Sequence, residues 1–141
     1  MSCVQKSIAI PQVPRGCHLI TDTILENLPE IKDFQCRLLN LFLQHTSASL
    51  TINENCCSAV RTDLDNWMNK VVPEGPNWKH KEEGADDMPA HAKCSMMGVS
   101  LNIPITDGHL ALGTWQGIYL NEHRNNGGSR RLVITITGNR K

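Results

Sequence analysis

Several features that mark common classes of protein are scarce or missing in this sequence. Its 14 Lys and Arg residues balance 14 Asp and Glu residues, so no net field favours nucleic acid or an anionic membrane. The longest apolar runs fall far short of the roughly 20 residues that a membrane-spanning helix needs. The first residues contain no apolar signal-peptide core. These absences predict a cytoplasmic protein that binds neither nucleic acid nor membrane.

No internal repeat, linker or low-complexity segment divides the sequence, which predicts a single domain over residues 1–141. The six cysteines include no C-x-x-C pair, and the adjacent Cys56 and Cys57 would point to different faces of an expected helix. We therefore expect free, mostly buried thiols rather than disulfides or a cysteine metal site.

Runs of apolar and β-branched residues predict strands at 3–10, 36–45, 99–105, 109–112, 117–123 and 130–137. Asn125-Asn-Gly-Gly128 is typical of the hairpin turn that would join the last two. A short helix is expected from Thr21 or Asp22 through Leu28, where Pro29 ends it. With two main helices elsewhere, the pattern predicts an α+β fold of packed, mostly antiparallel sheets.

The first main helix should begin at Thr51-Ile-Asn-Glu54, which matches the S/T-x-x-E capping box, and run to about Val71. Its expected apolar stripe consists of Cys57, Val60, Leu64, Trp67, Met68 and Val71. The second should run from Asp86 or Asp87 to Gly98. Between them, residues 73–87 have no hydrophobic period, and loops of this length are functional or disordered.

Three histidines are the main candidates for chemistry. In a strand at 36–45, His45 shares a face with the apolar Leu39, Leu41 and Leu43, so it must find a polar partner. His80 lies in the long loop and His91 on the second helix. The three could converge as metal ligands do, or each could be hydrogen-bonded locally without any shared role.

Glu122 lies on the apolar face of its strand with Ile118 and Leu120, where an acid needs a cation, a metal or a raised pKa. Arg130, across the Asn-Gly turn, is in phase to pair with it, either for structure or for function. Gly113-Thr-Trp-Gln-Gly117 offers a stacking indole and an amide, or only a bulge at a sheet corner. Asp63 and Glu54 are acids near the first helix, and each has a local structural explanation in the helix dipole or the capping box.

These residues together resemble the YjbQ family of small, largely uncharacterised proteins, some of which are described as secondary thiamine-phosphate synthases. The resemblance covers roughly residues 5–138 and rests on these positions: His45-Thr-Ser-Ala-Ser-Leu-Thr-Ile-Asn-Glu54, Asp63, His80, Ala90-His91, Ile105-x-Asp107-Gly108-x-Leu-x-Leu-Gly-Thr-Trp-Gln116, Glu122 and Arg131. It implies an α+β homotrimer with sites near subunit interfaces. It also implies a pocket lined by His45, His80 and His91 that binds a metal or an anion.

Three functions follow as hypotheses. The first is a synthase that joins a hydroxymethylpyrimidine diphosphate to a thiazole phosphate, although no glycine-rich phosphate loop precedes a helix. The second is a hydrolase with zinc or magnesium, and the third is a binding module that holds a small anion without turnover. We assign catalysis to His45, Glu54, Asp63, His91 and Glu122, metal binding to His45, His80 and His91, and binding of a phosphorylated molecule to Thr46, Ser47, Asn53, Trp115, Gln116, Arg130 and Arg131.

Two expectations concern details. The alternation of side chains along the last strand favours Arg130 as the inward arginine, whereas the family motif favours Arg131.

The second detail is assembly. Open strand edges and Trp78 in the long loop favour the trimer, with the loop against a neighbour. The alternative is a monomer whose loop folds back on its own helix.

Overall fold

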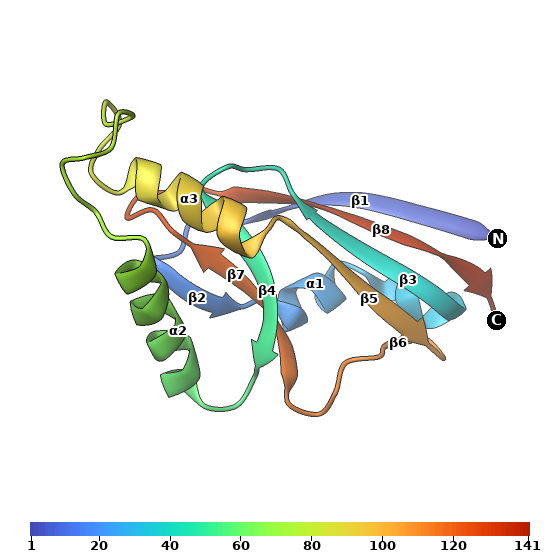
Figure 1. Cartoon of the computed structure of the whole chain (residues 1–141). Coiled ribbons are helices and arrows are strands. Elements are labelled where there is room, and N and C mark those ends of the chain that lie inside the picture. The colour runs from blue at the N-terminus through green and yellow to red at the C-terminus, as the bar shows by residue number, and fades with distance from the viewer.

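The structure, a computed structural model, describes residues 1–141 as two antiparallel sheets with three α-helices and one 3₁₀ helix (Figure 1). In chain order the elements are β1 (Ser2–Ile10), β2 (Gly16–Leu19), α1 (Thr21–Glu26), the 3₁₀ helix η1 (Pro29–Asp33), β3 (Phe34–Leu43), β4 (Ala48–Glu54), α2 (Ser58–Val71), α3 (Asp87–Met97), β5 (Ser100–Thr106), β6 (His109–Leu110), β7 (Gln116–Glu122) and β8 (Arg130–Arg140). The α+β class is confirmed. No helix is long and apolar enough to cross a membrane.

The larger sheet has the strand order β1-β8-β3-β5-β6, and its central strand β3 shows why the sequence forms it. Leu39, Leu41 and Leu43 are buried, as their alternation predicts, while Leu38 and Phe42 on the other face are each 44% exposed. The buried face packs on α1, η1 and the second sheet. Because β1 pairs with β8 from Ser2 to Ile10, the two termini of the chain lie together (Figure 1).

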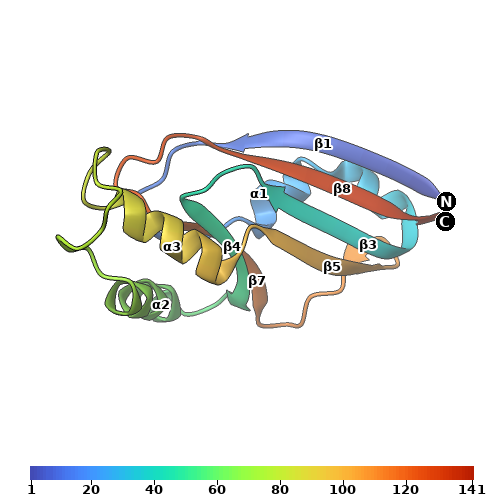
Figure 2. The ribbon, with the colours of Figure 1, turned by 45° about the horizontal axis from the view of Figure 1, so that its top comes forward.

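The smaller sheet, β2-β7-β4, carries the other two helices. The helix α2 packs against β2, which is labelled in Figure 1, and α3 packs against β4 (Figure 2). Residues 72–86, between these helices, contain no helix or strand. Arg124, just after β7, donates to Asp86 and Asp87, so the end of β7 lies beside the first turn of α3. This corner holds most of the polar side chains discussed below.

The predicted start of the first main helix is wrong. Residues 48–54 are strand β4, in which Thr51 pairs with Tyr119, and α2 begins only at Ser58. Pairing with β7 gives alternate backbone amides of this segment partners in the sheet, and the Glu54 amide donates to the Asn53 side chain. Glu54 does not cap the helix: its carboxylate accepts hydrogen bonds from the amides of Cys56 and Cys57 in the turn before α2, and the helix start has no side-chain cap.

Two further expectations from composition need correction. All six cysteines are free as predicted, but only Cys94 is buried; residues 3, 36, 56 and 57 are exposed. In the apolar stripe of α2 only Met68 is buried, and Trp67 and Val71 are about half exposed. Likewise Pro29 begins a 3₁₀ helix rather than simply ending α1.

Candidate functional site

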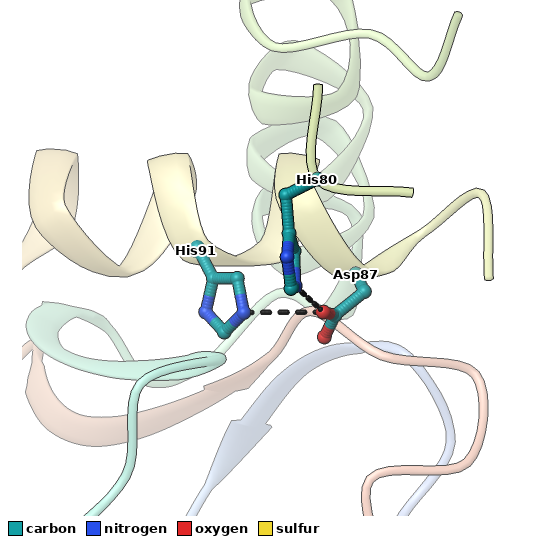
Figure 3. A group of neighbouring side chains, drawn as sticks. All are labelled: His80, Asp87 and His91. Carbon is teal, nitrogen blue, oxygen red and sulfur yellow. Dashed lines mark hydrogen bonds and ion pairs between the residues drawn. The ribbon is translucent and has the colours of Figure 1, made fainter. Parts of the chain in front are cut away.

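Three side chains from the loop and from α3 converge on one point (Figure 3). His80 comes from the loop, and Asp87 and His91 lie one turn apart on α3, so both face the same side of the helix. Asp87 Oδ2 lies 2.7 Å from His80 Nε2 and 3.2 Å from His91 Nε2. One potential ligand atom from each residue thus lies within 4.8 Å of the others.

The hydrogen bond on the far side of His91 sets its tautomer. His91 Nδ1 lies 2.7 Å from the carbonyl oxygen of Thr46, which can only accept, so Nδ1 carries the proton. In the neutral ring Nε2 then presents a lone pair toward the Asp87 carboxylate. Two acceptors face each other, and a cation between them, or a proton on His91, resolves the repulsion. Metal-binding histidines commonly have such a carbonyl behind them.

Asp87 is buried, with 1% exposure, and is held as a carboxylate. Burial raises the pKa of this acid, but the hydrogen bond from His80 and the positive charges of His91 and Arg124 outweigh it and hold the pKa below its usual value. Arg124 donates to Asp87 Oδ1 at 2.5 Å and to Asp86 at 3.1 Å. It also donates to the Glu83 carbonyl, so it ties the loop to the turn after β7.

His45 lies outside this cluster but next to it. With His91 it lines a cavity of about 420 Å³, whose other lining residues are Thr46, Cys94, Ser95, Gly98 and Val99. His45 Nε2 accepts a hydrogen bond from the backbone amide of Arg131 at 2.8 Å. Burial and the nearby charge of Arg130 lower the pKa of His45, so the ring is neutral with its proton on Nδ1. It therefore offers a donor rather than a metal-binding lone pair.

Behind His45, Glu122 and Arg130 form a fully buried ion pair. Arg130 Nε and Nη2 donate to the two carboxylate oxygens at 2.7 and 2.5 Å, and Nη2 also donates to the Ser47 hydroxyl at 2.9 Å. Glu122 is 0% and Arg130 4% exposed. The strand phase thus identifies the inward arginine correctly, while Arg131 is exposed. The pair is fully satisfied, so neither partner is free to bind a substrate in this chain.

Comparison with known proteins identifies the family of this chain. A family model described as "UPF0047 protein YjbQ-like" matches residues 6–139. The chain belongs to the YjbQ family. It is 50% identical to the UPF0047 protein YjbQ of Escherichia coli O157:H7 over 134 residues, which is 95% of this chain and 97% of that protein.

Solved structures of YjbQ-family proteins show the same fold. An uncharacterised conserved protein of the YjbQ/UPF0047 family from Clostridium acetobutylicum is 32% identical and superposes with a TM-score of 0.79, covering 93% of this chain and 98% of that one. A "YbjQ-like protein of unknown function" from Sulfolobus solfataricus P2 has a TM-score of 0.86 at 20% identity, covering 98% and 99%. At that identity the likeness shows the fold alone.

In the YjbQ-family chain, Thr46 and Ser47 lie near the histidines, but several other predicted site residues lie far from them. Glu54 and Gln116 are paired at one end of the smaller sheet, while Glu122 is at the other end of the same strand. Six residues of strand separate them by roughly 20 Å. Asn53 and Trp115 share the distant end, and Asp63 is exposed on α2. Within one chain, the predicted site is therefore two separate groups, and the roles assigned to the distant group stay predictions.

Sequence reasoning missed Asp87 and Arg124. The Asp-x-x-x-His spacing of Asp87 and His91 was a usable signal, because residues four apart meet on a helix.

The sequence also did not predict a group of buried polar side chains formed by Ser49, Asn121 and His123. There His123 Nε2 lies 2.9 Å from the Ser49 hydroxyl, which accepts from Asn121, and Asn121 Oδ1 has no partner. Nothing in the local sequence marks these residues as neighbours.

Proposed function

We propose that the protein is a metal-dependent enzyme that acts on a phosphorylated small molecule, with hydrolysis as the reaction that its site supports best. The observation that carries the proposal is the convergence of His80 Nε2, Asp87 Oδ2 and His91 Nε2 within 4.8 Å. Two imidazoles and one carboxylate are a donor set found in catalytic zinc sites. Held in this way, a divalent ion would supply a bound water of lowered pKa and positive charge for a phosphate.

The surrounding residues fit such a substrate. The cavity of about 420 Å³ begins at His91, so a molecule in it would lie against the metal ligands. His45 would donate from Nδ1 to a phosphate oxygen. Arg131, exposed beside His45, would pair with the phosphate charge. Glu122 is unsuited to the catalytic role predicted from the sequence, because both of its oxygens are already bonded to Arg130.

Metal analysis of purified protein tests the proposal directly. After chelation and titration with zinc, wild type should take up about one equivalent per chain, and His91→Ala and Asp87→Asn should take up far less. His109→Ala is the matched control, since His109 is exposed on β6 outside the cluster. Uptake below about a tenth of an equivalent by wild type would remove the metal from the proposal. Loaded protein should then hydrolyse p-nitrophenyl phosphate, and His45→Ala should slow it.

The synthase activity implied by the family resemblance is a second candidate. An exposed Arg131 next to the cavity is the feature that favours it, because loss of a diphosphate needs a free cation. Incubation with both pyrimidine and thiazole phosphates and magnesium should then form thiamine phosphate. Product that persists after loss of His45, His80 and His91 together would come from a contaminant. Ligand binding without any conversion would instead support the non-catalytic anion-binding module.

We also propose that the chain assembles as a homotrimer. The outer face of the larger sheet exposes Leu38 and Phe42, and α2 exposes Trp67 and Val71, which an adjacent copy would cover. Assembly would also offer a route by which Trp115 of a neighbour approaches the histidines. Trp78, the loop residue expected to contact a neighbour, donates from Nε1 to the Pro73 carbonyl of its own chain. Light scattering should return the mass of three chains, and a single-chain mass at micromolar concentration would exclude the trimer.

A further inference from the structure

A second cavity lies between β2 and α2 and shares no residue with the histidine cluster or the cavity beside it. It measures about 390 Å³ and is lined by Arg15, Gly16, Cys17, His18, Ser58, Arg61, Thr62 and Asp65. The four residues from α2 have the spacing 0, 3, 4 and 7, so one face of the helix forms one wall. The segment 15–18, at the start of β2, forms the other.

Two opposite charges on α2 face this cavity without pairing. Arg61 and Asp65 are four residues apart, a spacing at which such residues commonly form an ion pair, yet no nitrogen–oxygen contact joins them. The guanidinium of Arg61 makes a long 3.5 Å contact to the Glu54 carbonyl and lies within hydrogen-bonding reach of the Tyr119 side chain, but it contacts no carboxylate. Asp65 accepts only a 3.4 Å hydrogen bond from Asn69. Both charges keep most of their bonding capacity for another group.

Arg15 provides an internal comparison. Its NH2 lies 2.6 Å from the Glu74 carboxylate, and its Nε donates to Asn125 at 3.0 Å. This arginine is neutralised within the chain and serves to hold the loop. Besides Arg15, the cavity therefore has one positive and one negative charge without an ion-pair partner, rather than the excess of positive charge that a phosphate site requires.

Cys17 forms the wall that faces both of these charges. Burial, together with the charge of Asp65, raises the pKa of its thiol to about 12, so the thiol stays neutral. A neutral thiol is neither a nucleophile nor a metal ligand, which argues against catalysis or metal binding here. His18 donates from Nε2 to the Pro14 carbonyl at 2.7 Å, so its Nδ1 remains available, as does the hydroxyl of Ser58 at the first turn of α2.

We propose that this cavity binds a free α-amino acid as its zwitterion. The ligand carboxylate would pair with Arg61, on the side of the cavity toward the amino end of α2, where the helix dipole also favours negative charge. The ligand ammonium would pair with Asp65, one turn further along. An α-amino acid carries its ammonium and its carboxylate on the same carbon atom, so it bridges two such groups, whereas phosphate or a simple amine satisfies only one. The proposal is independent of the metal site.

Calorimetric titration of the full-length protein with each of the common amino acids tests this. We expect one or a few to bind saturably, and their N-acetyl and carboxamide derivatives to bind about tenfold or more weakly, since each lacks one charge. Arg61→Gln and Asp65→Asn should weaken binding of the best amino acid by a similar factor. Lys70→Gln, which removes an exposed charge elsewhere on α2, is the matched control and should bind as wild type does.

Amide chemical shifts measured during the titration would locate the ligand, and should move at residues 15–18 and 58–65 but not around His91. Circular dichroism would confirm that each variant is folded. No saturable binding by any amino acid up to about 10 mM would overturn the proposal. So would unchanged binding to the Asp65→Asn variant, or inorganic phosphate that binds at these residues as tightly as the amino acid.

Discussion

Lowering the pH should destabilise the protein through His123, a buried residue that directly follows β7 in the smaller sheet. His123 is 1% exposed, and its Nε2 lies 2.9 Å from the Ser49 hydroxyl. Burial lowers its pKa to about 3, and the charges of Lys93 on α3, Arg130 on β8 and Arg15 before β2 act in the same direction. The folded protein therefore keeps this ring neutral far below the pH at which an unfolded histidine takes up a proton.

The direction and size of the effect follow from proton linkage. In the unfolded chain the histidine pKa is about 6.5, so between about pH 6.5 and pH 3 the unfolded state binds a proton that the folded state does not. The stability from His123 is present above pH 6.5 and is lost progressively as the pH falls through this window. The loss amounts to about 1.4 kcal/mol per pH unit at full slope, or about 2 kcal/mol between pH 7 and pH 5.

Urea unfolding of wild type and His123→Gln at pH 7 and pH 5 measures this contribution. Glutamine has no titration in this range, and its amide can still bond to the Ser49 hydroxyl. Wild type should lose about 2 kcal/mol more than the variant between the two pH values. His45, whose pKa is also lowered, contributes equally to both proteins. Protein and salt concentrations are held constant, since assembly would make stability depend on concentration. Equal losses in the two proteins would refute the reasoning.

Three other variants test the corner of the fold around the histidines. Glu122→Gln leaves Arg130 buried without its anion and should lower the free energy of unfolding by about 3–5 kcal/mol. The double variant Glu122→Leu with Arg130→Met should lower it much less, because neither charge remains. Similar losses for the two proteins in urea unfolding would contradict this account. Gly127→Ala places a methyl group against the Glu122 carboxylate and should lower the melting temperature, and an unchanged melting curve would show that the turn can move. Arg124→Gln removes the group that orients Asp87 and should weaken zinc binding roughly tenfold, measured by competition with a chelator; unchanged affinity would show that Asp87 needs no such support.

The sequence alone was sufficient wherever a local pattern decides the structure. Alternation along residues 36–43 predicted the buried leucines of β3, because successive side chains of a strand face opposite sides. The same reasoning correctly identified Arg130, rather than Arg131, as the partner of Glu122. The hairpin predicted between them is wrong, because β7 and β8 lie in different sheets, but the connection that joins these strands is short. Glu122 and Arg130 are therefore close in sequence, and their pairing needed no knowledge of distant packing.

Local patterns failed where a distant segment competed for the same backbone. Thr51 to Glu54 has the composition of a helix cap, yet these residues pair with β7, more than 60 positions further along the chain. Each ladder hydrogen bond satisfies a backbone group that the helix would have left free for its cap. The stripe on α2 is a similar case, since periodicity shows that its members share a face but not what covers that face.

The candidate site was decided by tertiary structure. The helical spacing of Asp87 and His91 predicts from sequence that these two side chains lie together. His80 reaches them only because the loop returns to the first turn of α3. Arg124, from the turn after β7, holds the loop there by donating to the Glu83 carbonyl. Conversely, Glu54 and Glu122 both belong to the positions that carry the family resemblance, yet they do not meet. Glu54 lies opposite Gln116 at one end of β7, and Glu122 is at the other end of that strand. Side chains meet in a site according to the relative placement of whole helices and strands, which burial of the apolar core determines and which no local pattern records.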